Sequence, residues 1–453
     1  MLGMLVLWFA LLAGLIIFAI GPGRQGGALT LAYFIGLSLI HVPGVLVFVA
    51  NASGMAYEQE TEIGFELTLM GMIAFVAGAV LAVRTDKNRI GQQRPMSRAA
   101  AIELASLGWR FVVVGFLAYF VFVPLSFSVP SLTAGIAALG ALLVIGLWLR
   151  LHASMAMNDR RSTAVTLATI PLLPFTTVVS GGFISYGTYW ALSVVTFLFS
   201  VVRRRFWFYA LAPVVVFLGL SLFVTYMGER TGIRQLVQQE QAALTARVTR
   251  VSTIFTQFQL LDLGSPIHRG HLNDRLNQNF LVGAGVMRHE DGLTDLAYGS
   301  TVPWWAPIPR AIWPDKPVIG GGGDLVADYT GIFFGTDTSV GAGQVLEFYI
   351  NFGYAGVVAG FLGLGFLLMR IDRSIMRAFA TNDLRRVLLM AMPALNLLQP
   401  GGNLLEILVG TLSAYLTAYA LLYFKVFRFP EQLDAKSNSP VSAARALGRD
   451  RAV

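Results

Sequence analysis

The chain has 453 residues and a net charge of +8; 55% of its residues are hydrophobic, only 13% are charged, and its mean hydropathy is +0.66. Because soluble proteins carry about 25% charged residues, this composition predicts an integral membrane protein. The absence of cysteine excludes disulfides, thiolate nucleophiles, iron–sulfur clusters and cysteine zinc sites.

Eleven apolar stretches are predicted to cross a membrane as helices. A spanning helix needs roughly 20 mostly apolar residues. The first 20 residues have no basic n-region and no small-residue cleavage site, so we expect them to stay as the first helix. The predicted spans are 2–20, 28–50, 64–83, 111–129, 132–151, 163–181, 185–202, 206–227, 346–369, 387–399 and 404–424. The tenth is short and contains Pro393, so we expect it to be broken or tilted.

Basic residues collect in alternate loops, and this pattern predicts the orientation of the spans. Arg203, Arg204 and Arg205, for example, follow the seventh span, whereas the short loop at 51–63 carries glutamates instead. Because cytoplasmic loops carry the excess of Lys and Arg, the N-terminus is expected outside and the C-terminus in the cytoplasm. The net charge of +8 is then a sign of membrane topology, and no nucleic acid partner is expected.

This topology divides the chain into four parts. Residues 1–227 hold spans one to eight, residues 346–425 hold the last three, and residues 426–453 form a polar cytoplasmic tail that is expected to be disordered. Residues 228–345 form one large outer loop, since long loops cross membranes regardless of their charge. The predicted fold is an all-α integral membrane protein with about eleven transmembrane helices and one large extracytoplasmic loop.

Two helices are predicted inside this loop. Apolar residues recur at helical spacing over 229–262, with several arginines among them, and this pattern predicts an amphipathic helix. We expect it to lie on the bilayer surface, or to turn some of those arginines toward a lipid phosphate. A second helix is predicted over 271–288, ending near Gly283 and Gly285.

The sequence carries no motif for a cofactor or a metal. There is no Walker A motif and no dinucleotide fingerprint, and the run Gly320–Gly323 lacks a following Gly-Lys-Ser/Thr, so it predicts a flexible turn. His268 and His271 are three residues apart with Gly270 between them, which is not the spacing of a helical zinc site. We therefore expect no cofactor and no metal. The energy for any reaction then arrives within the substrate, or the process is transport down a gradient.

The segment 301–317 of the loop combines stiffness, aromatic rings and charge. Its five prolines exclude a helix or a central strand. Beside them stand Trp304, Trp305, Trp313, Arg310, Asp315 and Lys316. The tryptophans suit the headgroup level of a membrane or a sugar ring. Arginine offers phosphate a bidentate fork and lysine a point charge, so a rigid loop that holds both indicates a lipid pyrophosphate.

Acidic and amide side chains occur where the chain re-enters the membrane. Asp324 and Asp328 follow the glycine run four residues apart, and Glu347 begins the ninth span, with Asn351 one turn below it on the same face. Ionisable groups just inside a membrane are functional candidates, although a capping or packing role is the alternative for each. Further polar residues expected at this level are Glu66, the turn at 399–403 and Glu406.

These residues suit the transfer of a sugar from a polyprenyl pyrophosphate, whose leaving group is already activated and needs no nucleotide. Catalysis requires cations for the charge that grows on the leaving group, and a carboxylate that takes the proton from the acceptor hydroxyl. The expected cations are Arg310 and Lys316, with Arg250, Arg288 and Arg230 in reserve. The base is Glu347, Asp315, Asp324 or Asp328, and Trp304, Trp305, Trp313 and Asn351 complete the expected substrate-binding set.

Two stretches resemble a known family. "IPRAIWPDKP" (308–317), a glycine stretch, and then "EFYINFGYAGVVAGFLGLG" (347–365) are similar to the polysaccharide repeat-unit polymerases of the Wzy type, the O-antigen polymerase-like proteins. Proteins of that family carry a Pro-Arg-x-x-Trp-Pro-x-Lys-Pro segment in the large outer loop and a Glu–Asn-Phe-Gly–Gly stretch that opens the next span. The matching positions are Pro309, Arg310, Trp313, Pro314, Lys316, Pro317, Glu347, Asn351, Phe352, Gly353 and Gly356.

The resemblance implies a multi-spanning glycosyltransferase of the GT-C type in the bacterial inner membrane. Such an enzyme moves a growing glycan from undecaprenyl pyrophosphate onto the next lipid-linked repeat unit at the periplasmic face. The implied partners are an undecaprenyl-pyrophosphate-linked oligosaccharide, membrane lipid, a flippase and a chain-length regulator. A ligase of the related type, which passes finished glycan to lipid A core or to a protein, has similar architecture and remains an alternative.

Two other classes of function remain open. A lipid-linked oligosaccharide flippase or other transporter would favour paired repeats with interrupted helices in matching positions, and the sequence has no such internal symmetry. An export or assembly scaffold would perform no chemistry and should tolerate both Arg310→Ala and Glu347→Ala.

Overall fold

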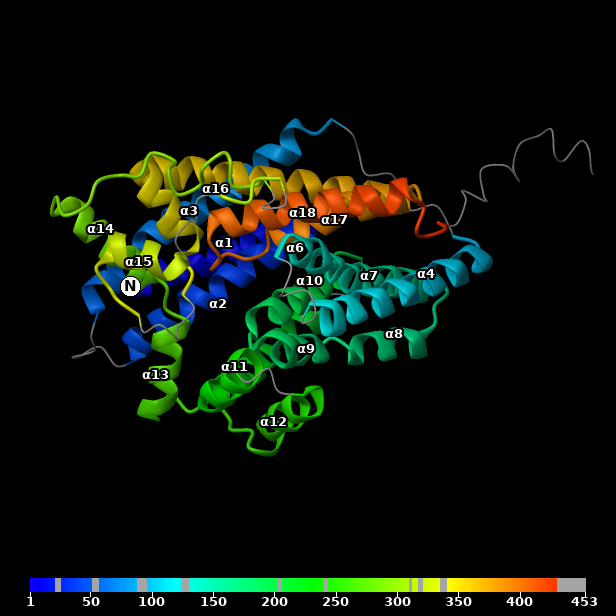
Figure 1. Cartoon of the computed structure of the whole chain (residues 1–453), viewed down its shortest axis with the longest axis horizontal. Coiled ribbons are helices and arrows are strands. Elements are labelled where there is room, and N and C mark those ends of the chain that lie inside the picture. The colour runs from blue at the N-terminus through cyan, green and yellow to red at the C-terminus, as the bar shows by residue number, and fades with distance from the viewer. Residues whose placement is uncertain are drawn as a thin grey trace, which may run out of the picture.

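A computed structural model describes residues 1–20, 26–50, 57–87, 96–123, 130–201, 206–239, 243–308, 312–316, 321–334 and 340–429. All regular structure in these ranges is helical (Figure 1). The elements are α1 (Leu2–Ile20), α2 (Ala28–Ala50), α3 (Glu58–Thr85), α4 (Arg98–Leu117), the π-helical turn η1 (Ala118–Phe122), α6 (Pro130–Leu139), α7 (Ala141–Ala156), α8 (Arg160–Ala168), α9 (Leu172–Gly181), α10 (Ser185–Val201), α11 (Phe206–Arg234), the π-helical turn η2 (Gln235–Gln239), α12 (Leu244–Thr256), α13 (Pro266–Arg275), α14 (Asn279–Glu290), α15 (Gly322–Thr330), α16 (Gly343–Ala380), α17 (Leu384–Asn396) and α18 (Leu404–Tyr423).

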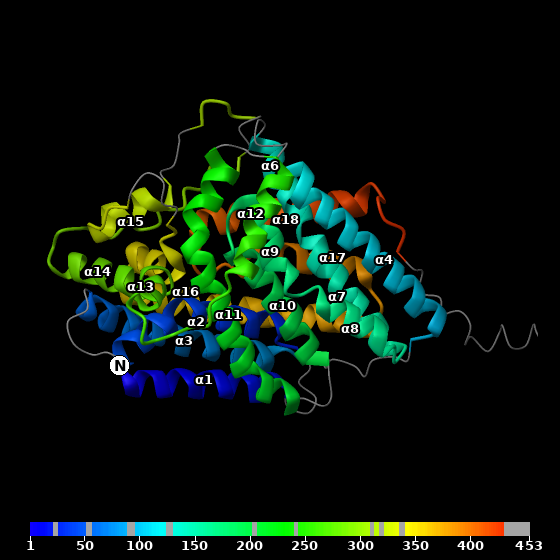
Figure 2. The same ribbon diagram turned by 90° about the horizontal axis from the view of Figure 1, so that it is seen from below.

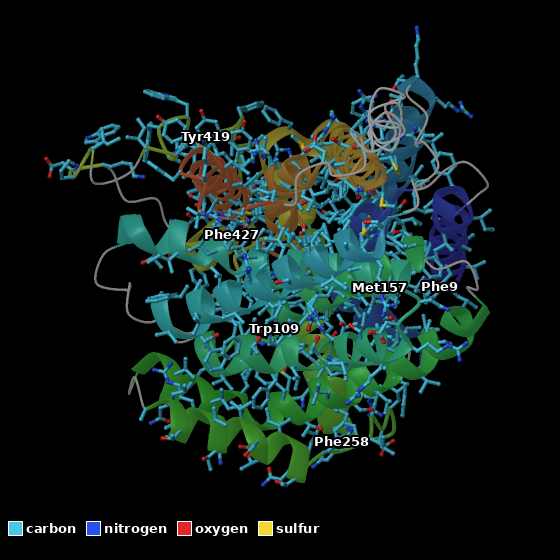
Figure 3. The ribbon with its side chains drawn as sticks, turned by 90° about the vertical axis from the view of Figure 1, so that its right-hand side faces the viewer. Phe9, Trp109, Met157, Phe258, Tyr419 and Phe427 are labelled. Carbon is cyan, nitrogen blue, oxygen red and sulfur yellow. The ribbon has the colours of Figure 1, made fainter. Side chains whose placement is uncertain are left out.

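Nine segments of the described chain are long and apolar enough to cross a membrane. They are Leu2–Ala19, Ala28–Ala50, Glu58–Thr85, Arg98–Phe122, Thr133–Ala156, Arg160–Gly181, Ala212–Val237, Gly343–Ala380 and Leu404–Tyr423. Large apolar side chains on different helices remain exposed, among them Phe9, Trp109 and Tyr419 (Figure 3). Exposed apolar surface on this scale is typical of contact with lipid. The predicted class, a helical membrane protein, is confirmed.

Two of the eleven predicted spans are absent from those nine segments. The stretch 185–202 forms α10, which has 17 residues, and 387–399 overlaps α17, which has 13 residues with Pro393 inside the helix. The ninth predicted span was also too short, because α16 runs from Gly343 to Ala380 and contains a break. Residues 124–129 of the fourth predicted span lie outside the described residues.

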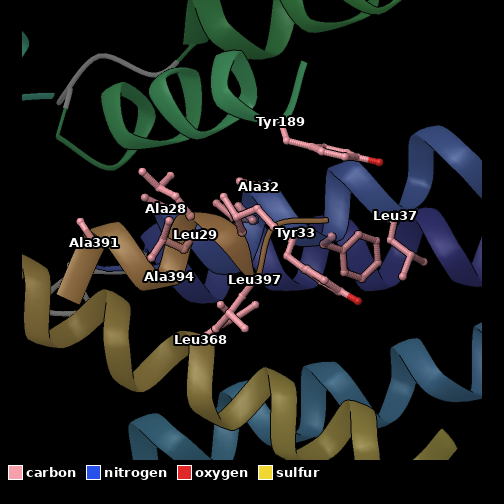
Figure 4. Close-up of a cluster of buried hydrophobic side chains, with 14 of the residues drawn as sticks. Ala28, Leu29, Ala32, Tyr33, Leu37, Tyr189, Leu368, Ala391, Ala394 and Leu397 are labelled. Atoms are coloured by element: carbon pink, nitrogen blue, oxygen red, sulfur yellow. The ribbon is translucent and has the colours of Figure 1, made fainter. Parts of the chain in front are cut away.

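Helix α2 runs through the centre of the core. Figure 4 shows its side chains Ala28, Leu29, Ala32, Tyr33 and Leu37 among residues of three other helices. Those neighbours include Tyr189 of α10, Leu368 of α16, and Ala391 and Ala394 of α17. Figure 2 shows α1 along one edge of the bundle and α11 crossing it obliquely.

Glycines on one face of α3 bring the backbones of α14 and α16 into contact with it. Gly64, Gly71 and Gly78 recur every seven residues. A Cβ atom on Gly78 would collide with the carbonyl oxygen of Leu362 in α16, and one on Gly64 would collide with that of Asn279 in α14. Small residues allow membrane helices this close approach. The result is a closely packed unit of α3, α14 and α16.

The single helix predicted over 229–262 is wrong. Helix α11 continues to Arg234 and is followed by η2, α12 is a separate helix, and residues 257–265 are not helical. Ile233 of α11 belongs to one buried cluster with Val251 and Ile254 of α12. The apolar residues that matched one helical repeat therefore belong to two helices that pack against each other.

The helix predicted over 271–288 is also wrong, because α13 ends at Arg275 and α14 begins at Asn279. The connection bonds to α2 beside its internal proline: Gly44 N donates to the Leu276 carbonyl over 3.1 Å, and Gln278 N donates to the Ile40 carbonyl over 2.9 Å. A proline inside a helix disturbs the neighbouring backbone bonds and leaves groups for such partners.

Gly283 and Gly285, which were expected to end that helix, lie inside α14. A Cβ atom on Gly283 would collide with the carbonyl oxygen of Glu60 in α3. Their role is close packing rather than helix termination. In the predicted turn at Gly320–Gly323, Gly321 caps α15 and Gly322 and Gly323 begin it, while Gly320 lies outside the described residues.

Helices α13, α14 and α15 gather at one end of the bundle, on the left in Figure 1. We call this the loop end. The first residue of α1 lies there too, and α16 begins at this end before running the length of the bundle.

Candidate functional site

A cavity of about 220 Å³ opens at the loop end between α15 and the first turns of α16 and α18. Asp324 and Asp328 of α15, Glu347 of α16 and Glu406 of α18 all line it. The remaining walls include Ser300, Thr301 and Asn403. Four carboxylates that the sequence analysis selected one by one thus come together, although they span 83 positions of the chain between the first and the last. The cavity is our candidate site.

Glu347 is the most buried of these carboxylates, with 1% of its surface exposed. Its Oε2 accepts a hydrogen bond of 2.6 Å from the backbone amide of Leu404, the first residue of α18. Its Oε1 is buried and has no hydrogen-bond partner among the described residues. The Thr301 hydroxyl lies near the carboxyl group without good hydrogen-bond geometry to Oε1. One oxygen is therefore anchored and the other is available to a ligand in the cavity.

The turn at 399–403 fixes the beginning of α18 against the beginning of α16. The Asn403 side chain accepts a hydrogen bond from Ala342 N over 2.9 Å and donates one to Glu406 over 3.3 Å. Gln344 N donates to the Pro400 carbonyl over 3.0 Å. The turn predicted from the sequence therefore sets the distance between Glu347 and the N-terminus of α18.

Helix α16 is broken just after its first turns. Phe352 and Gly353 leave the helical conformation, with φ of −144° and +61° respectively. The carbonyl of Ile350 accepts a bond of 2.8 Å from Ala297 N, and that of Asn351 accepts one of 3.1 Å from Tyr298 N. A break in a membrane helix is tolerated where other groups satisfy the freed carbonyls. Here the loop at 297–301 supplies those groups.

Asn351 holds that loop against the cavity. Its side-chain oxygen accepts a bond of 2.8 Å from Gly299 N, and its amide nitrogen donates to the Thr301 hydroxyl over 2.8 Å and to the Glu347 carbonyl over 2.7 Å. The residue is 4% exposed. The sequence predicted a substrate-binding role for Asn351, but its amide is fully engaged in positioning Thr301 beside Glu347.

The proline- and tryptophan-rich segment contains no helix at 301–308 or 312–316, as its prolines predicted. Lys316 Nζ donates to the carbonyls of Ala306 and Ile308, each over 2.9 Å, and so ties the C-terminal end of the segment to its middle. The rings of Trp305 and Trp313 meet edge to face with centroids 6.1 Å apart. Trp304 is 83% exposed and Asp315 is also exposed. Pro309, Arg310, Ala311 and Pro317 lie outside the described residues.

Three arginines lie within electrostatic range of Tyr226 of α11. Arg230 and Arg234 follow one turn apart on α11, and Arg275 ends α13. Burial and the positive charges of Arg230 and Arg234 lower the pKa of Arg275, against the opposing effect of Asp274. Like charges held close together favour an anion between them. We call Arg230, Arg234 and Arg275 the arginine cluster.

Two other arginines that the sequence predicts as phosphate ligands, Arg250 and Arg288, do not belong to the arginine cluster. Arg250 of α12 forms a salt bridge with Glu229. Arg288 of α14 lies against Gly331, at the C-terminal end of α15, and its Nε has no hydrogen-bond partner among the described residues. Of the three arginines held in reserve, only Arg230 belongs to the arginine cluster.

The turn between α9 and α10 lies between the arginine cluster and the cavity. The Arg234 guanidinium stands over the Phe183 ring, 5.4 Å from its centroid. The rings of Phe183 and Tyr186 are edge to face with centroids 6.3 Å apart. Glu406, on the cavity wall, is within electrostatic range of the Tyr186 phenol. Phe183 thus contacts the arginine cluster, and Tyr186, its neighbour, lies within electrostatic range of the cavity wall.

The sequence pattern does not single out Arg275, Ser300 or Thr301, whereas Arg234 is one of the arginines of 229–262 expected on the bilayer surface or toward a lipid phosphate. The spacing of Arg230 and Arg234 was a usable signal, because residues four apart share one face of a helix. Arg275 and Thr301 carry no such signal, because their neighbours come from distant parts of the chain.

In the residues that the structure describes, all regular structure is helical, nine segments are long and apolar enough to cross a membrane, and an acidic cavity lies at one end of the bundle. Comparisons with models of known protein families, with curated proteins and with solved structures found no match for this chain. The likeness of 308–365 to polysaccharide repeat-unit polymerases therefore stays a prediction from the sequence.

Proposed function

We propose that the chain is a glycosyltransferase of the GT-C type that polymerises lipid-linked oligosaccharide repeat units. It transfers the growing glycan from undecaprenyl pyrophosphate to the next lipid-linked unit at the periplasmic face of the bacterial inner membrane. The observation that carries this proposal is the Glu347 carboxyl group, buried beside a cavity with one oxygen anchored by Leu404 N and the other unpartnered among the described residues. A general base needs this combination of fixed position and an available oxygen.

Glu347 acts on the acceptor. Its Oε1 takes the proton of an acceptor hydroxyl as that oxygen bonds to the anomeric carbon of the donor sugar. The bond between the anomeric carbon and the diphosphate oxygen breaks, and its electron pair leaves with the lipid diphosphate. The positive end of the α18 dipole lies next to Oε2.

The arginine cluster receives the diphosphate. Arginine binds phosphate oxygens in bidentate fashion, and three guanidinium groups stabilise the charge that grows on the leaving group. The donor sugar then extends from the arginine cluster past Phe183 and Tyr186 toward the cavity, so both reacting groups meet near Glu406 and Glu347. Arg310 remains a further candidate for this role, and Lys316 supports the segment that carries it.

The loop end faces the periplasm in this proposal, with the N-terminus outside and the C-terminus in the cytoplasm, as the basic loops predict. Trp304, which is 83% exposed, then lies at the headgroup level. A flippase supplies the lipid-linked repeat unit on this side, and a chain-length regulator limits the product.

Purified protein in liposomes, given one lipid-linked repeat unit and no nucleotide, tests the proposal. A ladder of glycans on the lipid is the expected product, and Glu347→Gln should form it about 10²–10⁴-fold more slowly. Exchange of the substrate between leaflets without a ladder would identify a transporter instead. Transfer of a preformed glycan to an added acceptor, again without a ladder, would identify a ligase. No turnover and no exchange with intact wild-type protein would reject all three activities.

A further inference from the structure

The cavity and the arginine cluster divide the charge of the site between them. Four carboxylates line the cavity, and among its described lining residues there is no Lys, Arg or His. The arginine cluster lies beyond Phe183 and Tyr186. A ligand that carries a diphosphate at one end and a sugar at the other therefore has one preferred direction in this site.

The four carboxylates differ in their surroundings. Asp324 and Asp328 on α15 and Glu406 on α18 are exposed at the rim, whereas Glu347 is buried. Asp324 also accepts a hydrogen bond of 3.0 Å from Gly321 N at the start of its own helix. The buried Oε1 of Glu347 is an acceptor that no described residue satisfies. Such an atom is costly unless a ligand or water donates to it.

Ionised carboxylates only accept hydrogen bonds, so the ligand must donate them. The cavity volume of about 220 Å³ equals the space of roughly seven water molecules in liquid water, a size that suits a single sugar ring. A ring hydroxyl or an ammonium group donates to carboxylates, whereas a uronic acid or a phosphate would be repelled by the exposed carboxylates of Asp324, Asp328 and Glu406.

We infer that this cavity binds the terminal sugar of the acceptor, and that it selects sugars whose hydroxyl or ammonium groups donate hydrogen bonds and rejects sugars that carry an acidic group. The inference rests on the proposed function, and it names the class of acceptor that the proposed function leaves open. Ser300, Thr301 and Asn403 supply neutral contacts on the same walls.

Saturation-transfer NMR on the purified full-length protein tests this selectivity at pH 7. The probes are methyl glucoside, methyl glucosaminide in its ammonium form, and methyl glucuronide. The variant is the double substitution Asp324→Asn and Asp328→Asn. It removes two charges at the rim of the cavity while keeping the shape of both side chains. Asp291→Asn is the matched control, because Asp291 is an exposed carboxylate after α14 that does not line the cavity.

We expect saturation-transfer signals for the glucoside and the glucosaminide. The signal for the glucuronide should be about tenfold weaker or absent. The double variant should admit the glucuronide and weaken the glucosaminide, while Asp291→Asn should leave all three signals unchanged. Equal signals for the three probes, or a double variant that behaves like wild type, would overturn the inference. So would the absence of any transfer. Because the experiment needs neither donor nor turnover, a failed polymerisation assay is a separate result.

Discussion

The Glu347 carboxylate accepts a hydrogen bond from the backbone amide of Leu404 over 2.6 Å, so α16 caps the N-terminus of α18. At its other end, α16 caps α2 in the same way: Asp372 accepts from Leu29 N over 2.8 Å and from Thr30 N over 2.9 Å. The two carboxylates differ in one respect. Both oxygens of Asp372 are bonded, whereas Oε1 of Glu347 is left without a partner in the described chain. This difference separates a structural cap from a candidate catalytic base.

The first prediction concerns Glu347→Gln. Glutamine keeps an oxygen for Leu404 N but cannot take a proton from a hydroxyl, so polymerisation should fall by about 10²–10⁴-fold. The rate of ladder formation in liposomes measures this, with the thermal unfolding midpoint as the test of folding.

Glu103→Gln on α4 is the control, because Glu103 is exposed and far from the cavity lining. It should retain the wild-type rate. Equal rates for wild type and Glu347→Gln would remove Glu347 as the base.

The second prediction concerns Arg275→Ala in the arginine cluster. A hydrogen bond to a charged group contributes about 1.5–3 kcal/mol, so the KM for the lipid-linked donor should rise roughly 10–100-fold. Binding of undecaprenyl diphosphate without a sugar should weaken by the same factor. Added salt should weaken binding more in wild type than in the variant, because salt screens the lost attraction.

Arg269→Ala is the matched control on the same helix, since Arg269 donates to the carbonyls of Leu263 and Gly264. Its KM should stay close to wild type. If both variants changed KM equally, the effect would belong to α13 as a whole and not to a diphosphate site.

The third prediction concerns the break in α16. Gly353 has φ of +61° and ψ of −151°, a conformation open almost only to glycine, and an added Cβ would meet nothing closer than 3.8 Å. Gly353→Ala should therefore destabilise the protein by about 1–3 kcal/mol through backbone strain alone. Polymerisation should fall too, because Asn351 and Thr301 depend on this break.

The control is Gly363→Ala, a glycine inside α16 with no atom within 4 Å of an added Cβ. Alanine is the better helix former, so this variant should unfold at the wild-type temperature or above. Thermal unfolding in detergent compares the two. Equal losses would argue against strain at residue 353.

The fold class was predictable because a low content of charged residues and long apolar stretches directly indicate that lipid surrounds the helices. Helix ends in the loop were not. Val251 and Ile254 continue the apolar repeat of Ile233, but a repeat does not say where the chain turns back to pack on itself. Likewise the sequence predicts a helix end near Gly283, and only the position of Glu60 in α3 reveals that Gly283 is a packing glycine.

The chemistry of the site was predictable residue by residue, but its assembly was not. Asp324, Asp328, Glu347 and Glu406 stood out as ionisable groups near a membrane, and they share one cavity. Nothing local indicated that Leu404 would anchor Glu347, or that Arg275 would join Arg230. The charge of Arg250 made it a candidate for binding phosphate. In the structure Arg250 forms a salt bridge with Glu229, 21 positions earlier in the chain.

The last prediction concerns α10 and decides the topology. This helix has 17 residues and is about 25 Å long at 1.5 Å per residue, short of a hydrocarbon core of about 30 Å. The basic loops nevertheless require it to cross. If it does, Phe333 in the outer loop and Arg160 at the start of α8 lie on opposite sides of the membrane.

The chain has no cysteine, so Phe333→Cys and Arg160→Cys each place one thiol in an otherwise unreactive protein. Phe333 is 83% exposed and Arg160 is exposed at a helix end, so both substitutions should be tolerated. A membrane-impermeant maleimide added to spheroplasts should label only Phe333→Cys, and Arg160→Cys should react after permeabilisation. Labelling of both thiols from outside would mean that α10 does not cross, because then an even number of spans separates the two sites. The reverse pattern would place the cavity and the arginine cluster in the cytoplasm, where a periplasmic polymerase could not use them.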